Sequence, residues 1–189
     1  VDLNYLESAL LELANNREAG PSIQTDAILE YCSIQIKYRQ NVTRAVDFLD
    51  SLIQSNTFTR KNLNRIKLLY GEALTMQGKP WKALIIYTQV DHDDGDGILG
   101  EEARFKKAEL SYYEGEFEFA QSQLDVLKQS TSKLLSNDAL ELSILITDNY
   151  GLDSNYIAMA WFSKADLYIE QLQFAKAFSL FDSIRTNYP

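Results

Sequence analysis

The chain has 189 residues, of which 46% are hydrophobic and 24% charged, a balance that predicts a folded core and excludes intrinsic disorder. Its 18 basic and 27 acidic side chains give a net charge of -9, which argues against nucleic acid as a partner because phosphate binding needs clustered Lys and Arg. One cysteine and one histidine, Cys32 and His92, can form neither a disulfide framework nor a Cys/His zinc site within one chain, and no apolar run reaches the roughly 20 residues that a membrane helix needs.

In chain order, the apolar periodicity predicts a leading helix over residues 1–17 and then a series of helical hairpins, about ten helices in all, with no strand. The hairpins are expected at 22–56, 59–93, 99–130 and 153–189. Each has a small residue near the start of its second helix, which lets the two helices approach closely: Ala45, Ala83, Ala120 and Ala177. Because the chain opens on Val1 and closes on Pro189, directly after a helical run, we expect it to be a fragment, and the absence of a targeting segment then says nothing about compartment.

The spacing of these alanines predicts one helix outside the hairpin series. Their successive separations are 38, 37 and 57 residues, so the last interval holds about one helix too many. We expect the extra helix within 133–148, where SNDALELSILIT has apolar residues at helical spacing and Ser136 or Asn137 as the N-cap. An unpaired helix should bend or interrupt a stack of hairpins.

The stretch GDGILG, from Gly95 to Gly100, has the G-x-G-x-x-G spacing of a dinucleotide-binding loop and follows the strand-like run LIIYTQV. Such a loop needs a strand before it and a second parallel strand after it. Here Ala83, Tyr87 and Val90 instead have the spacing of a helix that begins at Pro80, and four nearby aspartates would repel a pyrophosphate. We therefore expect an acidic loop that leads into a helix near Leu99.

A calcium site in the same stretch fits the sequence incompletely. An EF-hand loop needs oxygen ligands at positions 1, 3, 5 and 12 and glycine at position 6. With Gly97 at position 6, His92 and Ala103 occupy two ligand positions; with Asp91 at position 1, Gly95 and Asp96 occupy positions 5 and 6. At most a weak, adventitious cation site is expected, and we predict no cofactor and no specific metal.

The last hairpin carries a family resemblance. Trp161, Ala165, Tyr168, Ala177, Phe181, Ile184 and Pro189 follow the spacing W-x3-A-x2-Y-x8-A-x3-F-x2-I-x4-P. This resembles the tetratricopeptide repeat (TPR), a helix-turn-helix unit of 34 residues, although Lys164 replaces a leucine and Leu172 replaces the turn glycine. The resemblance implies an all-α, right-handed α-solenoid of TPR-like hairpins with one extra helix; the alternative is a compact helical bundle. The segment LSNDALELSILITDNYGLD is similar to large envelope-associated TPR proteins of Gram-negative bacteria, which favours the periplasm or cell envelope.

TPR arrays hold a peptide or a partner helix in a concave groove lined mainly by the first helix of each hairpin. Carried over by position, the expected partner-binding residues are Arg65, Leu68, Glu72, Phe105, Glu109, Tyr112, Phe162 and Asp166. An apolar residue followed four positions later by an acid recurs in this set, so we expect a protein or peptide partner with apolar anchors and basic flanks. The alternative is that the aromatic residues pack between neighbouring hairpins and that the acids are only solvated; Trp81 and Trp161 are also expected to be packing residues.

The sequence favours a non-catalytic protein-interaction module. One alternative is a structural or oligomerisation segment of a longer chain. A second is an enzyme that uses groove carboxylates, since two acids can do acid-base chemistry without histidine, but 27 scattered acids single out no pair.

Overall fold

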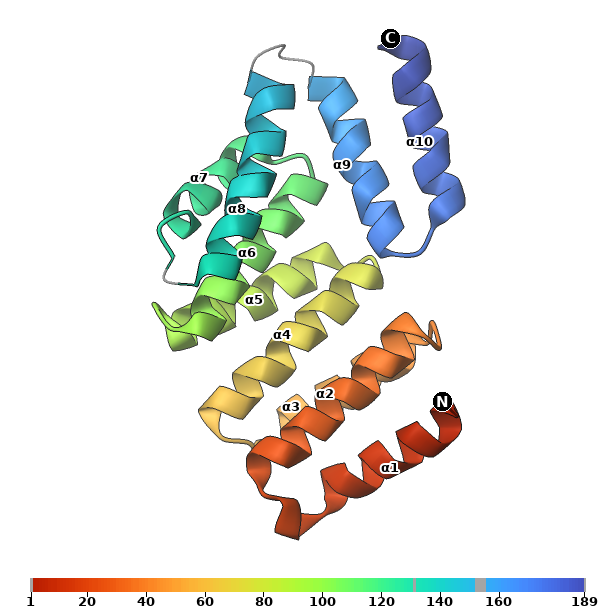
Figure 1. Cartoon of the computed structure of the whole chain (residues 1–189), viewed down its shortest axis with the longest axis vertical. Coiled ribbons are helices and arrows are strands. Elements are labelled where there is room, and N and C mark those ends of the chain that lie inside the picture. Colours follow the sequence, from red (N-terminus) through yellow and green to blue (C-terminus); the bar gives the residue numbers. More distant parts are fainter. Residues whose placement is uncertain (1, 131, 152–155, 189) are drawn as a thin grey trace. The chain divides into compact units, whose positions relative to one another are not determined.

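The computed structural model describes residues 2–130, 132–151 and 156–188, and within these ranges the chain forms ten α-helices and no strand (Figure 1). The helices are α1 (Leu3–Asn15), α2 (Pro21–Lys37), α3 (Val42–Ser55), α4 (Arg60–Met76), α5 (Pro80–Asp94), α6 (Ile98–Tyr113), α7 (Phe117–Leu127), α8 (Lys133–Ile146), α9 (Tyr156–Glu170) and α10 (Phe174–Asn187). A short 3-10 helix, η1 (Arg17–Ala19), follows α1, and a π-helical turn, η2 (Thr147–Gly151), follows α8. The start of the last predicted hairpin, 153–155, and its final residue, Pro189, lie outside the described residues.

The all-α prediction and the expected number of helices are confirmed for the described residues. The helices form two compact units, Val1–Asp93 and Asp94–Pro189. In unit 1, α2 packs against α1, α3 and α4, and α3 packs against α4. In unit 2, α6 packs against α7, α8 and α9, while α7 packs against α8 and α9 against α10. None of the helices in the described residues is both long and apolar enough to cross a bilayer.

Side chains and prolines at the helix starts explain why helices begin where they do. Asp2, Asn41 and Thr59 each accept a hydrogen bond from a backbone N–H in the first turn of the helix that follows. Pro21 and Pro80 begin α2 and α5, where the missing N–H of proline is no loss.

The strand-like run LIIYTQV lies within α5, as the helical spacing predicts. Ala83, Tyr87 and Val90 are all buried, so they form the packing face of this helix. The acidic segment that was expected to be a loop is partly helical, because α5 continues to Asp94. The connection to α6 is therefore short, and α6 begins at Ile98, next to the expected start at Leu99.

Four helix pairs are joined by a short turn in which one residue has positive φ: Gln40 (52°), Gly78 (74°), Gly115 (83°) and Leu172 (57°). Three of these turns share one hydrogen-bond pattern. At Gly78, the N–H of Lys79 donates to the carbonyl of Leu74 at 2.9 Å and the N–H of Gly78 donates to that of Thr75 at 3.0 Å, the two bonds of a Schellman motif. The same two bonds occur around Gly115 and Leu172.

A buried alanine follows each of these turns at the same distance. The four are Ala45, Ala83, Ala120 and Ala177, the fourth residues of α3, α5, α7 and α10. None exposes more than 2% of its surface. The four small residues are thus all buried near the start of the second helix of each pair.

Two details of the expected elements were wrong. The N-cap of α8 is Ser132, whose hydroxyl accepts from the N–H of Leu135, and not Ser136 or Asn137, so the helix begins one turn earlier. Trp81 was expected to pack but is 76% exposed, because it lies on the outer face of α5. Trp161 does pack, edge-to-face against Tyr188 with ring centroids 5.9 Å apart.

Candidate functional site

Unit 2 contains a groove of about 500 Å³ walled by α6, α8 and α9. Its apolar lining consists of Phe105, Tyr112, Tyr113, Leu142, Leu145 and Ile169. Its charged lining consists of Lys106, Glu109, Asp138, Glu141, Asp166 and Glu170. Apolar and acidic side chains are thus interleaved on every wall.

Helical spacing puts the α6 side chains on one face. Phe105, Glu109 and Tyr112 are separated by four and three residues, so they lie above one another along the helix. Phe105 is half-buried and packs against the core of unit 2, and Tyr112 is only 2% exposed. Glu109 accepts a hydrogen bond from the ammonium of Lys106 at 2.9 Å. The α6 wall therefore offers apolar surface next to a carboxylate that is already partly neutralised.

A partly buried hydrogen bond joins the α6 and α9 walls. The hydroxyl of Tyr112 donates to Oδ2 of Asp166 at 2.6 Å. Burial raises the pKa of Asp166 above its ordinary value, and the bond from Tyr112 partly opposes that rise by favouring the carboxylate. Burial is also the main cause that raises the pKa of Tyr112, followed by the bond to Asp166. This bond links α6 to α9 within the groove lining.

Tyr113 lies beside this pair with three carboxylates around it. Only 8% of the residue is exposed, yet its hydroxyl has no hydrogen-bond partner among the described residues. Burial raises the pKa of Tyr113, and the negative charges of Glu109, Glu170 and Asp166 raise it further. Tyr113 is therefore a residue of the groove lining whose hydroxyl is not used in a hydrogen bond within the described residues.

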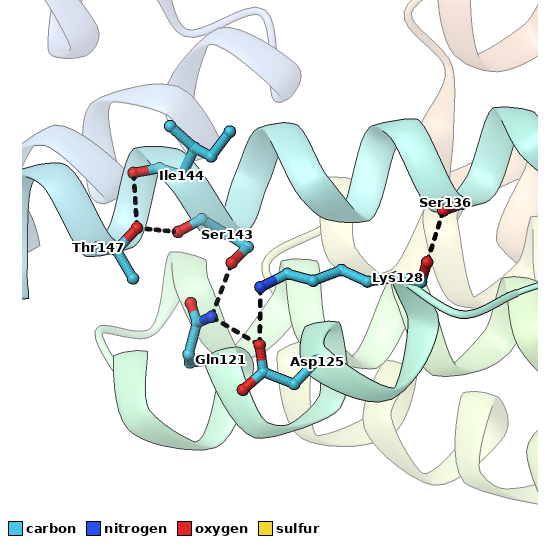
Figure 2. A network of polar contacts seen from close by, with 7 residues as sticks. All are labelled: Gln121, Asp125, Lys128, Ser136, Ser143, Ile144 and Thr147. Carbon is cyan, nitrogen blue, oxygen red and sulfur yellow. Dashed lines mark hydrogen bonds and ion pairs between the residues drawn. The ribbon is translucent and has the colours of Figure 1, made fainter.

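The third wall, α8, is attached to α7 by a polar network (Figure 2). The side-chain amide of Gln121 on α7 donates to Ser143 Oγ on α8 at 2.7 Å and to Asp125 at 3.0 Å. Asp125 also pairs with the ammonium of Lys128 at 2.8 Å, and the carbonyl of Lys128 accepts from the hydroxyl of Ser136 at 2.8 Å. The network contacts α8 at both Ser136 and Ser143, which fixes its position along α7.

The C-cap residue of α8, Thr147, bonds to the last turn of the helix through its side chain. The hydroxyl of Thr147 donates to the carbonyl of Ser143 at 2.8 Å and to that of Ile144 at 3.2 Å (Figure 2). The backbone N–H of Thr147 donates to the same two carbonyls, so its backbone and side chain both bond to them where α8 changes to the π-helical turn η2. The groove-facing residues upstream, Leu142 and Leu145, are held by a helix fixed at both ends.

The structure brings together half of the residues that the sequence proposed for the site. Phe105, Glu109, Tyr112 and Asp166 line one groove. Phe162 is on the same helix as Asp166 but stacks edge-to-face on Phe181, with ring centroids 5.8 Å apart, and does not line the groove.

The other three proposed residues belong to α4 in unit 1. Leu68 is only 8% exposed and is a core residue. Arg65 forms an ion pair with Asp26 on α2 at 2.6 Å, and Glu72 is half-buried. Arg65 and Leu68 are thus occupied by packing within unit 1.

Sequence reasoning missed the contribution of α8. Asp138, Glu141, Leu142 and Leu145 line the groove although they belong to the helix that interrupts the predicted hairpin series. Their spacing of three, one and three residues is that of a single helical face, so the sequence held the signal. The α8 face was missed because only the first helix of each predicted hairpin was expected to line the groove.

The glycines of GDGILG form a compact connector. Oδ2 of Asp94 accepts from the N–H groups of Leu99 and Gly100 at 3.0 and 3.1 Å and caps α6. A Cβ at Gly97 would lie 2.3 Å from the Asp94 carboxylate, and one at Gly100 would lie 2.2 Å from the carbonyl oxygen of Gly95. The G-x-G-x-x-G spacing therefore follows from close packing of this turn. Among the described residues, no group of three or more His, Cys, Asp or Glu side chains is arranged to hold a metal ion.

Unit 1 has a simpler cavity of about 580 Å³ on α4 and α5, lined by Lys67, Leu84, Ile85, Thr88, Gln89, His92 and Asp93. The ammonium of Lys67 lies 3.7 Å from the carboxylate of Asp93, to which Arg60 also pairs. The charges of Lys67 and Asp93 in this cavity are thus already paired within unit 1.

Comparison of the chain with protein-family models, with curated proteins and with solved structures found no match.

Proposed function

We propose that the chain is a non-catalytic protein-interaction module that binds a peptide or a segment of a partner protein in the unit 2 groove. The observation that carries the proposal is the convergence of three helices on one cavity of about 500 Å³ in which apolar and acidic side chains alternate. Apolar surface in a concave site supplies affinity, and a few polar groups supply orientation.

The proposed scaffold is a right-handed α-solenoid of TPR-like hairpins in which α8 is an added helix. Support comes from the recurrence of one Schellman turn at Gly78, Gly115 and Leu172 and of a buried alanine after each turn. The first helices of the proposed hairpins also pack on one another, α2 on α4 and α6 on α9. The separation of α6 from α9 by two helices, where α2 and α4 are separated by one, is what an added helix would produce.

The proposed partner carries apolar and basic residues. Five carboxylates line the groove against one ammonium, so a segment with Lys or Arg would meet complementary charge. Selection of a random displayed peptide library on the 189-residue chain tests this. Selected peptides should be rich in basic residues with interspersed apolar ones.

A matched pair of variants locates the site. Ile169 is 40% exposed and lines the groove, whereas Phe178 on α10 is 67% exposed and does not. Ile169→Arg should abolish binding of the selected peptides, because it places bulk and positive charge in the groove, and Phe178→Arg should leave binding unchanged. Equal binding by both variants and the wild type would show that the groove is not the site.

One observation favours a second function, that of a structural or oligomerisation segment. The outer face of α10 exposes Phe174 (51%) and Phe178 (67%). Exposed aromatic residues in one patch commonly mark an interaction surface. Sedimentation at several protein concentrations should then detect self-association that Phe178→Arg removes; a monomer at all concentrations excludes this function.

A further inference from the structure

We infer that the side chain anchored at the centre of the unit 2 groove is a cation, an arginine or lysine of the partner. The inference rests on the proposed peptide-binding function, but it gives the positive charge of the partner a different role. Basic residues at the flanks of a partner would mainly steer its approach, whereas an anchored cation would hold the complex together.

The position of the carboxylates argues for an anchor. Glu109 and Asp166 lie on facing walls, α6 and α9, and neither is fully exposed. Asp166 is buried enough for desolvation to raise its pKa. A carboxylate that has lost water gains more from a partner cation than one on an open rim, because screening by solvent is weaker.

Tyr113 supplies the second, independent observation. The residue is only 8% exposed and lines the groove, and its hydroxyl has no hydrogen-bond partner among the described residues. The nearby charges of Glu109, Glu170 and Asp166 act on this phenol. A guanidinium or ammonium is a donor-only group that could hydrogen-bond to the phenol oxygen and to the carboxylates at once.

The apolar lining fits the stem of such a side chain. Phe105 on α6 and Ile169 on α9 keep part of their surface exposed, whereas Tyr112 is 2% exposed and offers little surface for a large apolar anchor. Methylene groups of Arg or Lys pack on apolar surface while the charged head stays with polar partners. Arginine is favoured because its planar fork can meet two carboxylates and stack on an aromatic ring.

Three amidated peptides that differ only at a central residue test the inference: Gly-Leu-X-Leu-Gly with X as arginine, citrulline or norleucine. Citrulline keeps the shape of arginine without its charge, and norleucine keeps only an apolar chain. Chemical shifts of the ¹⁵N-labelled 189-residue chain report both site and affinity. The arginine peptide should shift groove resonances and bind roughly tenfold more tightly than the citrulline peptide.

Two variants and a control assign the effect to the groove. Tyr113→Phe removes only the hydroxyl, and Glu170→Gln removes only a charge; each should weaken the arginine peptide several-fold and leave the norleucine peptide unchanged. Glu118→Gln removes an exposed charge on α7, outside the groove, and should change neither.

The outcomes separate this inference from the proposed function. Equal binding of the arginine and norleucine peptides overturns the cationic anchor and leaves the groove as a peptide site. The cationic anchor is also wrong, and the peptide site remains, if none of the three peptides shifts the groove resonances but peptides from the displayed library do. If neither set shifts the groove, both the anchor and the peptide-binding function are wrong.

Discussion

At the scale of single residues, small side chains at helix crossings control how closely helices approach. Gly71 on α4 is the clearest case, since a Cβ there would lie 2.4 Å from Cε1 of Tyr87 on α5. Three ring atoms of Tyr87 lie within 3 Å of that hypothetical carbon. Tyr87 is itself buried, so its ring has little room to move.

Gly71→Ala should therefore destabilise the protein by about 1–3 kcal/mol, the usual cost of overpacking a core. This loss should occur although alanine is favoured over glycine in a helix interior by roughly 1 kcal/mol. Thermal or urea unfolding measures it. In a Tyr87→Leu background, which makes room, the same substitution should be neutral or stabilising; a loss in both backgrounds would show that the ring is not the cause.

Cys32 is a buried thiol rather than a reactive one. It has no exposed surface, and burial raises its pKa from 9.0 to about 12. Between these values the folded protein keeps a proton that the unfolded chain releases. The stability that the folded state gains from this difference in pKa is fully present below pH 9 and is lost as the pH rises toward 12.

The free energy of unfolding should accordingly fall with pH above about 9, with up to about 1.4 kcal/mol per pH unit from this thiol. Cys32→Ala should reduce that slope, whatever its effect on stability at neutral pH. Part of the slope should remain, because burial and a bond to Asp50 also raise the pKa of Tyr70 to about 12. Urea unfolding over a pH series measures both slopes, and identical slopes would contradict the assignment.

At the scale of elements, the turn between α9 and α10 departs from the other Schellman turns in one residue. Leu172 has a φ of 57°, in the left-handed region, where Gly78 and Gly115 take the same place in their turns. A side chain with a Cβ is strained there by roughly 1–2 kcal/mol, whereas glycine is not.

Leu172→Gly should stabilise the protein by roughly 0.5–1 kcal/mol, after allowance for the greater freedom of glycine in the unfolded chain. In a chain of this length the melting temperature should rise by about 2 °C. Gly78→Ala is the reverse control and should destabilise by a similar amount, since φ is 74° and no atom lies within 4 Å of the added Cβ. A loss on Leu172→Gly would mean that the leucine side chain contributes more packing than strain.

The helices themselves could be predicted because their signals are local. Apolar spacing, the first-turn Pro80 and the four alanines are read directly from the sequence. Where α5 ends was missed because hydrophilic aspartates resemble a loop, and the geometry shows instead that Asp94 caps the next helix. The N-cap of α8 was missed because several serines were available and only the backbone path selects Ser132.

The candidate site was less predictable because it depends on contacts between distant segments. Phe105, Glu109 and Tyr112 could be chosen as one face of a helix, but their joining to Asp166 depends on how α6 packs on α9. The lining by α8 depends on a helix outside the pattern, fixed through Gln121. Periodicity gives the face of a helix but not the element that the face meets.

At the scale of the whole molecule, the dominant property is negative charge. The net charge is -9 and the sequence pI is about 4.6. Excess like charge opposes the compact state and attracts cationic partners. An exposed ion pair such as Arg185 with Asp182 offsets little of this repulsion, because exposed pairs contribute little to stability.

Added sodium chloride should therefore act in opposite directions on folding and on binding. The Debye length falls from about 30 Å at 0.01 M to about 3 Å at 1 M, so salt screens the repulsion among carboxylates and should raise the melting temperature at neutral pH. The same screening should slow association of the arginine peptide and of basic peptides selected on the groove. Calorimetry and binding kinetics over one salt series measure both effects.

Near the pI of about 4.6 the net charge is close to zero, so the effect of salt on the melting temperature should nearly vanish there. A melting temperature that falls with salt at neutral pH would mean that local ion pairs, and not the overall charge, control stability. An association rate that is independent of salt would remove the electrostatic basis for a cationic partner.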